Sequence, residues 1–228
     1  MAGTLYIVST PIGNLEDITL RALRVLGEVD CICAEDTRTT RKLLAHYHIR
    51  NRLVSCHAYN IKQRIPQIIS RLQQGERVAL VSEAGTPGIS DPGHALVMAA
   101  VREGIAVVPI PGPSAVIAAL VASGLPTNRF VFEGFLPRKK GRQTKLHQLK
   151  DEPGTIVLYE SPQRVRKTIE DIVNIFGNRY IVLARELTKR FEEFIRGYAS
   201  DILQLLDEGE MKGEIVLLIA GTQFKPFT

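Results

Sequence analysis

The chain has 228 residues, of which 45% are hydrophobic and 23% are charged, and its net charge is +5. This composition supports one or two globular domains with a buried core and excludes extensive disorder. The three cysteines, Cys31, Cys33 and Cys56, exclude a closed disulfide framework and a zinc site built from two cysteine pairs. Unpaired cysteines suit a reducing compartment, so we expect a cytoplasmic location.

No segment has the properties of a secretory signal or a membrane anchor. The first basic residue is Arg21, and residues 3–9 have the pattern of a strand. The longest charge-free stretch, residues 104–128, contains four prolines, which would interrupt a membrane-spanning helix. We therefore expect no transmembrane helix.

Charge is distributed unevenly along the chain. Residues 37–75 contain eight Lys or Arg and no Asp or Glu, and residues 137–150 contain six more and again no acid. The two segments together carry +14, which leaves −9 for the rest of the chain. Such polarisation favours a polyanionic partner, although solvated basic helix faces would give a similar pattern.

Apolar runs alternate with amphipathic runs in the first half of the chain. Strands are predicted over residues 5–9, 31–34, 53–56, 78–82 and 105–110. Helices are predicted over residues 18–26, 39–47, 66–74, 95–103 and 115–122. Strands that alternate with helices are typical of a mainly parallel sheet with helices on both faces.

A second series of elements follows a predicted linker over residues 124–128. Its strands are predicted over residues 130–133, 156–160, 180–184, 193–198 and 215–220, and its helices over residues 142–149, 164–176 and 199–207. The pattern predicts two α/β domains, residues 1–122 with a mainly parallel sheet and residues 123–228 with a mixed sheet. The default ligand site of such an arrangement is a cleft between the domains.

Several common functional motifs are absent from the sequence. Neither G-x-G-x-x-G nor G-x-x-x-x-G-K-[ST] occurs, which disfavours an ordinary Rossmann or P-loop nucleotide site. There is no G-x-S-x-G and no H-E-x-x-H, and the five histidines are scattered. Serine hydrolase and zinc chemistry are therefore disfavoured.

Three Gly/Pro-rich loops each follow a predicted strand of the first domain and precede a helix. They cover residues 9–19, 82–93 and 109–115. Because the carboxyl ends of parallel strands meet at one edge of a sheet, we expect the loops to converge there. Prolines hold such loops rigid while glycines let the backbone approach a ligand closely. An ordinary strand-to-helix turn would look similar, except that the second loop is too long for one.

These loops belong to a longer series of motifs that covers nearly the whole chain. The first half contains T-P-I-G-N-L-x-D-I-T at 10–19, A-E-D-T-R at 34–38, S-E-A-G-T-P-G-I-S-D-P-G at 82–93 and P-I-P-G-P-S-A at 109–115. The second half contains E-G-F-L-P at 133–137, Y-E-S at 159–161, A-R-E-L-T-K at 184–189 and K-G-E at 212–214. In this order they closely resemble the ribosomal RNA small subunit methyltransferase I family of the tetrapyrrole methylase superfamily. Glu83 stands where that family commonly has Asp, and relatives often continue beyond the position of Thr228.

The resemblance implies a tetrapyrrole methylase-like fold, S-adenosylmethionine as the cofactor and no metal. It implies 2′-O-methylation of a cytidine in small-subunit ribosomal RNA, either naked or in the small ribosomal subunit, by a homodimer. The cofactor-binding residues that it implies in the first half are Pro11, Gly13, Ala84, Gly85, Ile89, Asp91, Gly112, Ser114 and Ala115. Those that it implies in the second half are Tyr159, Leu183, Ala184 and Gly213.

Methyl transfer to a ribose hydroxyl is an in-line displacement, so positioning supplies much of the acceleration while a base can assist removal of the hydroxyl proton. The candidate catalytic residues are Asp36, Glu83, Glu186 and Lys189, the last only if its pKa is lowered. An ion-pair network would explain these charges equally well. The candidate RNA-binding residues are Arg38, Arg41, Lys42, Arg138, Lys139, Lys140 and Arg142, which could contact phosphates.

Two other functions remain open for this sequence. A small-molecule tetrapyrrole methylase would share the fold, but it has less reason for two strongly basic segments. A non-catalytic RNA-binding protein of ribosome assembly would explain those segments but need not bind S-adenosylmethionine. Cofactor binding therefore distinguishes the second alternative.

Overall fold

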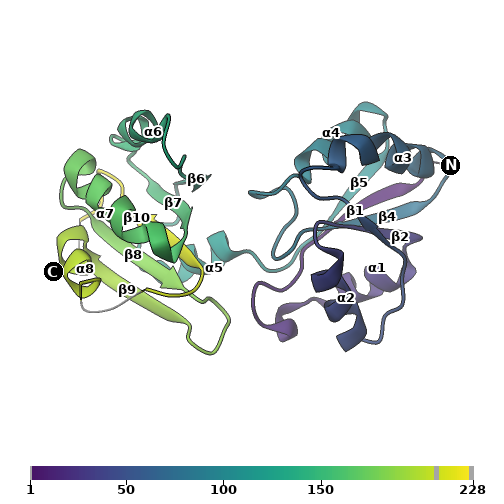
Figure 1. Ribbon diagram of the computed structural model, residues 1–228, viewed down its shortest axis with the longest axis horizontal. Helices are drawn as coiled ribbons and strands as arrows, with labels where there is room; N and C mark the ends of the chain where they lie inside the picture. Colours follow the sequence, from purple (N-terminus) through teal and green to yellow (C-terminus); the bar gives the residue numbers. More distant parts are fainter. Residues whose placement is uncertain (1, 208–210, 226–228) are drawn as a thin grey trace. The chain divides into compact units, whose positions relative to one another are not determined.

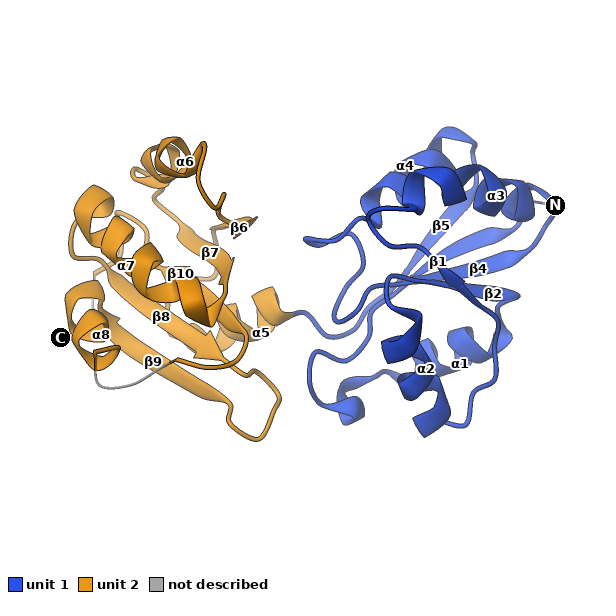
Figure 2. Cartoon of the chain, in the orientation of Figure 1, with its two compact units in different colours: residues 1–114 blue, residues 115–228 orange. Residues whose placement is uncertain are grey.

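The structure, a computed structural model, describes residues 2–207 and 211–225. The chain divides into two compact units, Met1–Ser114 and Ala115–Thr228 (Figure 2). We expected the boundary after residue 122. It falls earlier because helix α5 (Ala115–Ser123) packs against strands β8 (Tyr180–Arg185) and β10 (Ile215–Ile219) of the second unit. The predicted linker at 124–128 therefore lies within the second unit.

A fully parallel sheet forms the centre of the first unit. Its strands are β1 (Thr4–Val8), β2 (Cys31–Ala34), β3 (Leu53–Ser55), β4 (Arg77–Val81) and β5 (Ala106–Ile110). They lie side by side in the order β3-β2-β4-β1-β5. The prediction of a parallel sheet is confirmed, and the three cysteines are free and buried.

Helices cover both faces of this sheet (Figure 1). They are α1 (Leu20–Glu28), α2 (Thr37–His46), α3 (Ile61–Gln73) and α4 (His94–Arg102). Alternate residues of β2 explain the two cores, because Ile32 packs with α1 and α2 while Cys31 packs with α3 and α4. Helix α3 begins before the predicted start at Pro66, since the buried Ile61 anchors an additional turn.

The strand order creates a topological switch between β1 and β4. The chain leaves β1 through α1 toward β2, and it leaves β4 through α4 toward β5, on the opposite face of the sheet. In open α/β sheets, ligands bind outside the carboxyl ends of the strands at such a point. The loops that follow β1, β4 and β5 are those singled out in the sequence.

The second unit contains a mixed sheet, as predicted. Strands β6 (Phe130–Phe135), β7 (Thr155–Glu160), β8, β9 (Glu193–Tyr198) and β10 have the order β6-β7-β10-β8-β9. Only the β6–β7 pair is parallel among the pairs of this sheet that the structure describes. The remaining α-helices of the described chain are α6 (Arg142–Leu149), α7 (Pro162–Phe176) and α8 (Ala199–Leu205).

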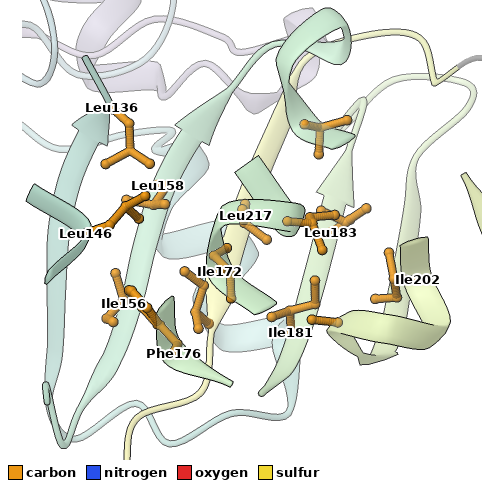
Figure 3. Packing of buried hydrophobic residues seen from close by; sticks show 14 of the residues in the cluster. Leu136, Leu146, Ile156, Leu158, Ile172, Phe176, Ile181, Leu183, Ile202 and Leu217 are labelled. Atoms are coloured by element: carbon orange, nitrogen blue, oxygen red, sulfur yellow. The ribbon is translucent and has the colours of Figure 1, made fainter. Parts of the chain in front are cut away.

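One face of this sheet is covered by a large apolar core (Figure 3). Ile172 and Phe176 of α7 pack with Ile156 of β7 and Leu183 of β8. Apolar residues spaced for one face of α7 explain why this segment forms a helix against a sheet. None of the described helices is both long and apolar enough to cross a bilayer.

Candidate functional site

The three Gly/Pro-rich loops are joined at the carboxyl edge of the first unit. Thr10 and Gly85 exchange two backbone hydrogen bonds, of 2.9 and 3.0 Å. The hydroxyl oxygens of Ser9 and Thr86 lie 2.9 Å apart, and the Thr86 hydroxyl donates to the Pro113 carbonyl at 3.1 Å. The predicted convergence of the loops is therefore confirmed. These bonds join the three loops at the switch point between β1 and β4.

Glycines allow the loops to approach one another this closely. A Cβ atom on Gly112 would lie 2.9 Å from the Cβ of Ser9. Gly85 has φ = 77°, which L side chains rarely adopt, and a Cβ there would lie 3.3 Å from Cγ2 of Ile12. Both glycines therefore allow the loops to pack closely. Their role in cofactor binding stays a prediction, and it would depend on this packing.

The second loop is folded by its own aspartate. The Asp91 carboxylate accepts backbone N–H groups from Gly88 at 2.8 Å and from Gly93 at 2.7 Å. These bonds hold the loop while Ala84 and Ile89 remain exposed on it. The structure therefore assigns Asp91 to shaping the loop and leaves the exposed backbone available to a ligand.

Asp36 lies at the start of α2 and is bound by Arg38. Its carboxylate accepts the Arg38 N–H at 2.7 Å and the Arg38 guanidinium at 2.9 Å. The side-chain hydrogen bond from Arg38 lowers the pKa of Asp36 to about 2, and the capping bond acts in the same direction. Asp36 is consequently a weak base, whereas the side chain of Arg38 is 85% exposed and can reach a ligand.

Glu35 is a candidate that the sequence prediction missed. It follows the last residue of β2, accepts the backbone N–H of Glu83 at 3.3 Å and has no ion pair within the described ranges. Burial raises the pKa of Glu35; the bond from Glu83 opposes this, and the charges of Asp91, Glu83 and Asp36 add to the increase. Its position at the carboxyl end of a buried parallel strand is the signal that could have identified it.

In the second unit, Lys189 lies between two carboxylates. Its Nζ is 2.9 Å from Oε1 of Glu186 and 3.0 Å from Oε2 of Glu214. The backbone N–H of Glu214 also donates to Glu186 Oε1 at 3.0 Å. A Cβ on Gly213 would lie only 2.4 Å from Cγ of Glu186, so this glycine lets the β8–β9 hairpin meet the segment before β10.

This arrangement contradicts the expected basic role of Lys189. Burial lowers the pKa of Lys189, but its hydrogen bonds to Glu186 and Glu214 raise the pKa by more than burial lowers it, so the net shift is upward. The bond from Lys189 lowers the pKa of Glu186. Lys189 is thus protonated at neutral pH, and both side chains hold the hairpin.

The other predicted cofactor residues of the second unit are divided between the two faces of its sheet. Tyr159 of β7 and Ala184 of β8 each pair with Val216 of β10, the strand between them. Their side chains therefore point to the same face of the sheet. Leu183 points to the other face, where it is fully buried in the apolar core (Figure 3). The prediction is therefore wrong for the side chain of Leu183, which could offer a ligand only its backbone.

Of the predicted RNA-binding residues, Arg142 is the one that the structure excludes. Its Nε lies 2.9 Å from Oδ2 of Asp171, its Nη2 donates to Thr168 at 2.7 Å, and the residue is only 8% exposed. The arginine is buried because an acid from α7 neutralises it. The other candidates are exposed on the surface: Arg38, Arg41, Lys42, Arg138, Lys139 and Lys140.

Among residues 2–207 and 211–225, no three His, Cys, Asp or Glu side chains lie close enough to hold an ion.

The chain is similar to known methyltransferases along nearly its whole length. The family model of Tetrapyrrole (Corrin/Porphyrin) Methylases matches residues 4–203. Ribosomal RNA small subunit methyltransferase I of Halalkalibacterium halodurans is 51% identical over 220 residues, which are 96% of this chain and 76% of that protein. The protein of the same name from Thermotoga maritima is 49% identical over 97% of this chain and 100% of its own length.

Similarity to solved structures concerns the fold alone. Uroporphyrin-III C-methyltransferase from Thermus thermophilus, solved with S-adenosyl homocysteine, has a TM-score of 0.68 and 17% identity, over 96% of this chain and 97% of that one. This agrees with the two α/β units described above. By its sequence and its fold, this chain belongs to the tetrapyrrole methylase family and, within it, to the ribosomal RNA small subunit methyltransferase I group.

Proposed function

We propose that the chain transfers a methyl group from S-adenosylmethionine to small-subunit ribosomal RNA, at the 2′-hydroxyl of a cytidine. Sequence identity of 49–51% to relatives named for small-subunit ribosomal RNA supports the substrate class. The observation that carries the site is the joining of three loops at the switch point of a parallel sheet, beside the Glu35 carboxylate, which has no cation partner among the described residues. The two basic segments support an RNA substrate over a small molecule.

The residues at this edge fit S-adenosylmethionine by charge and shape. The cofactor carries one more positive than negative charge, and Glu35 and Glu83 lie at the edge without ion-pair partners in the described part of the chain. Ala84 and Ile89 offer exposed apolar surface and backbone groups on the second loop. When bound, the cofactor supplies a methyl group on a positively charged sulfur.

We assign removal of the hydroxyl proton to Glu35. A general base works best when its pKa lies near the working pH, and the raised pKa of Glu35 meets this condition better than the lowered pKa of Asp36. Asp36 instead orients Arg38, whose exposed guanidinium is placed to contact a phosphate of the RNA. Protonated Lys189 holds the hairpin of the second unit through its bonds to Glu186 and Glu214.

The proposal extends to the location and the assembly of the protein. A reducing compartment that contains ribosomal RNA is the cytoplasm, where the three free thiols would persist. We further propose a homodimer, as the resemblance implies. Light scattering on the purified chain measures this directly, and a monomeric mass would overturn it.

The direct test is methyl transfer from labelled S-adenosylmethionine to naked small-subunit RNA, to assembled small subunits and to a porphyrin-type small molecule. The proposal is supported if the label is found in RNA and the RNA chain resists alkaline cleavage at one cytidine. Label only in the small molecule indicates the other branch of the family. Calorimetry that shows no cofactor binding to the folded chain would indicate a non-catalytic RNA-binding protein.

A further inference from the structure

A cavity of about 600 Å³ lies in the first unit where α2 ends and β3 begins. This is the amino edge of the sheet, opposite the edge that carries the three loops. Three of its side chains are basic, Arg41, His48 and Arg50, and three form an apolar wall: Leu44, Ile49 and Leu53. Its volume falls within the range of small-ligand sites, which run from roughly 300 to 1,000 Å³.

The two arginines of the cavity have no carboxylate partner within the described chain. Other arginines of the first unit are neutralised, such as Arg24 by Glu28 at 3.1 Å and Arg71 by Glu76 at 2.8 Å. The acids that border the acid-free segment 37–75, Asp36 and Glu76, pair with the arginines close to its ends, Arg38 and Arg71. Arg41 and Arg50 lie further inside the segment, where the sequence offers no acid nearby. Arg41 and Arg50 thus leave two guanidinium groups in a concave surface free to bind an anion.

His48 occupies a backbone position that normally belongs to glycine. It lies two residues after the end of α2 and has φ = 55°; its N–H donates to the Ala45 carbonyl at 3.2 Å, and the next N–H, of Ile49, donates to the Leu44 carbonyl at 2.9 Å. This is a Schellman ending, which usually has glycine in the left-handed position. The strained backbone places an imidazole on the wall of the cavity.

Two neighbouring helices show the same ending with glycine. After α3, Gly75 has φ = 97° and the corresponding bonds are both 3.1 Å. After α4, Gly104 has φ = 67° and the bonds are 3.1 and 2.9 Å. The fold therefore accepts glycine at this turn, and the one histidine coincides with the cavity that contains the unpaired arginines.

We propose that this cavity binds one nucleotide of the RNA substrate, with its phosphate held by Arg41, His48 and Arg50 and its sugar or base against the apolar wall. The proposal rests on the proposed function. Guanidinium groups bind phosphate oxygens in pairs, and base or sugar faces pack on apolar side chains.

The position of the cavity fits an RNA strand that runs along α2. Arg38 lies in the first turn of the helix, next to Asp36 at the carboxyl edge, and Arg41 and Lys42 follow along it toward the cavity. The helix has 10 residues, so it spans about 15 Å at 1.5 Å per residue. The cavity would therefore hold a nucleotide a short distance along the strand from the target ribose.

The test compares three variants for equilibrium binding to a small-subunit RNA fragment across a salt series. Arg50→Gln should weaken binding on the order of tenfold and reduce the salt slope by about one, because one phosphate contact is lost. His48→Gly should weaken binding while it raises the melting temperature, because glycine relieves the strain. Arg102→Gln is the matched control, since Arg102 is a cation at the end of α4 with no ion pair in the described residues; it should leave affinity unchanged.

Three outcomes would overturn the proposal. One is parental RNA affinity and salt slope in both Arg50→Gln and His48→Gly. A second is an equal loss with Arg102→Gln, which would show that the effect is only overall charge. Inorganic phosphate that raises the melting temperature of the parent and of Arg50→Gln equally would also count against a phosphate site here. Binding is measured without methyl transfer, so the proposed function can fail in the labelled-cofactor assay independently of this result.

Discussion

Arg41 and Arg50 of the first unit and Arg142 of the second have different surroundings, although all three come from acid-free segments of the sequence. In the first unit, Arg41 and Arg50 have no carboxylate partner within the described chain. In the second, Arg142 is buried against Asp171, which lies 29 residues further along the chain. A run of positive charge therefore does not by itself predict a basic surface, because the neutralising acid can come from a distant element.

The carboxylates at the strand ends show the same contrast. Glu35 follows β2, has no cation partner in the part of the chain that the structure describes, and burial raises its pKa. Glu186 follows β8 and is held by Lys189, whose hydrogen bond lowers its pKa. The surroundings of Glu35 suit proton transfer, and those of Glu186 suit stability.

The largest expected effect is on the buried ion pair. Arg142→Ala should destabilise the chain by roughly 3 kcal/mol in urea unfolding, the lower end for a broken buried pair, because the buried Asp171 keeps only the exposed Lys167, at 3.2 Å, as a cation partner. Arg142→Met combined with Asp171→Leu should recover much of this loss, since no uncompensated charge remains. An Arg142→Ala variant as stable as the parent would show that this arginine belongs with the exposed cations.

Glu35→Gln should slow methyl transfer at saturating RNA and cofactor by about 10²–10⁴-fold, the range for a lost general base. Because its folded pKa is raised, the protonated carboxyl favours folding at low pH, and this contribution is lost as the pH rises through that pKa. The neutral glutamine should therefore raise the melting temperature at pH 7. Single-turnover rates close to the parent's would exclude proton transfer by Glu35.

Gly112→Ala should destabilise the first unit by roughly 1–3 kcal/mol, because the added Cβ must displace Ser9. The displaced loops should also bind S-adenosylmethionine more weakly, which calorimetry measures. Gly27→Ala is the matched control, since nothing lies within 4 Å of the new Cβ. Equal cofactor affinity in both variants would argue against a site at the joined loops.

Lys189→Met should reduce stability by about 1 kcal/mol near neutral pH, since it removes partly exposed charge-assisted hydrogen bonds. The raised pKa of Lys189 means that its contribution is present at neutral pH and is lost as the pH rises through the folded pKa, above 10.5. Parent and variant should therefore converge in strongly alkaline solution. A slowed methyl transfer with unchanged stability would instead restore a catalytic role.

Exposed cations should give the smallest effect on stability. Replacement of Arg138, Lys139 and Lys140 by Gln should change the free energy of unfolding by no more than about 0.5 kcal/mol. RNA binding should weaken with a salt slope shallower by up to about two, at ~0.7 per lost phosphate contact, while cofactor affinity stays the same. A parental salt series would mean that this segment is only a solvated loop.

Local patterns were sufficient to predict most elements and the convergence of the loops. Apolar runs bounded by turn residues identified the strands, and parallel strands necessarily bring the ends of β1, β4 and β5 to one edge. The start of α3 was predicted wrongly at Pro66 because burial of Ile61 depends on α4 and the sheet. The assignment of α5 was also wrong, since an apolar helix at a boundary can pack on either side.

The sequence by itself determined the α/β class, the mixed and parallel sheets, the Gly/Pro loops and the family, because these depend on residue periodicity, backbone chemistry and motif order. Only the tertiary structure decided which charges are neutralised: Arg142 by Asp171, Lys189 by two carboxylates, and Glu35 by no cation of residues 2–207 and 211–225. It also placed His48 on the wall of a basic cavity. The physical reason is that a pKa, a salt bridge or a binding surface depends on groups within a few ångströms, which the chain brings together from distant positions.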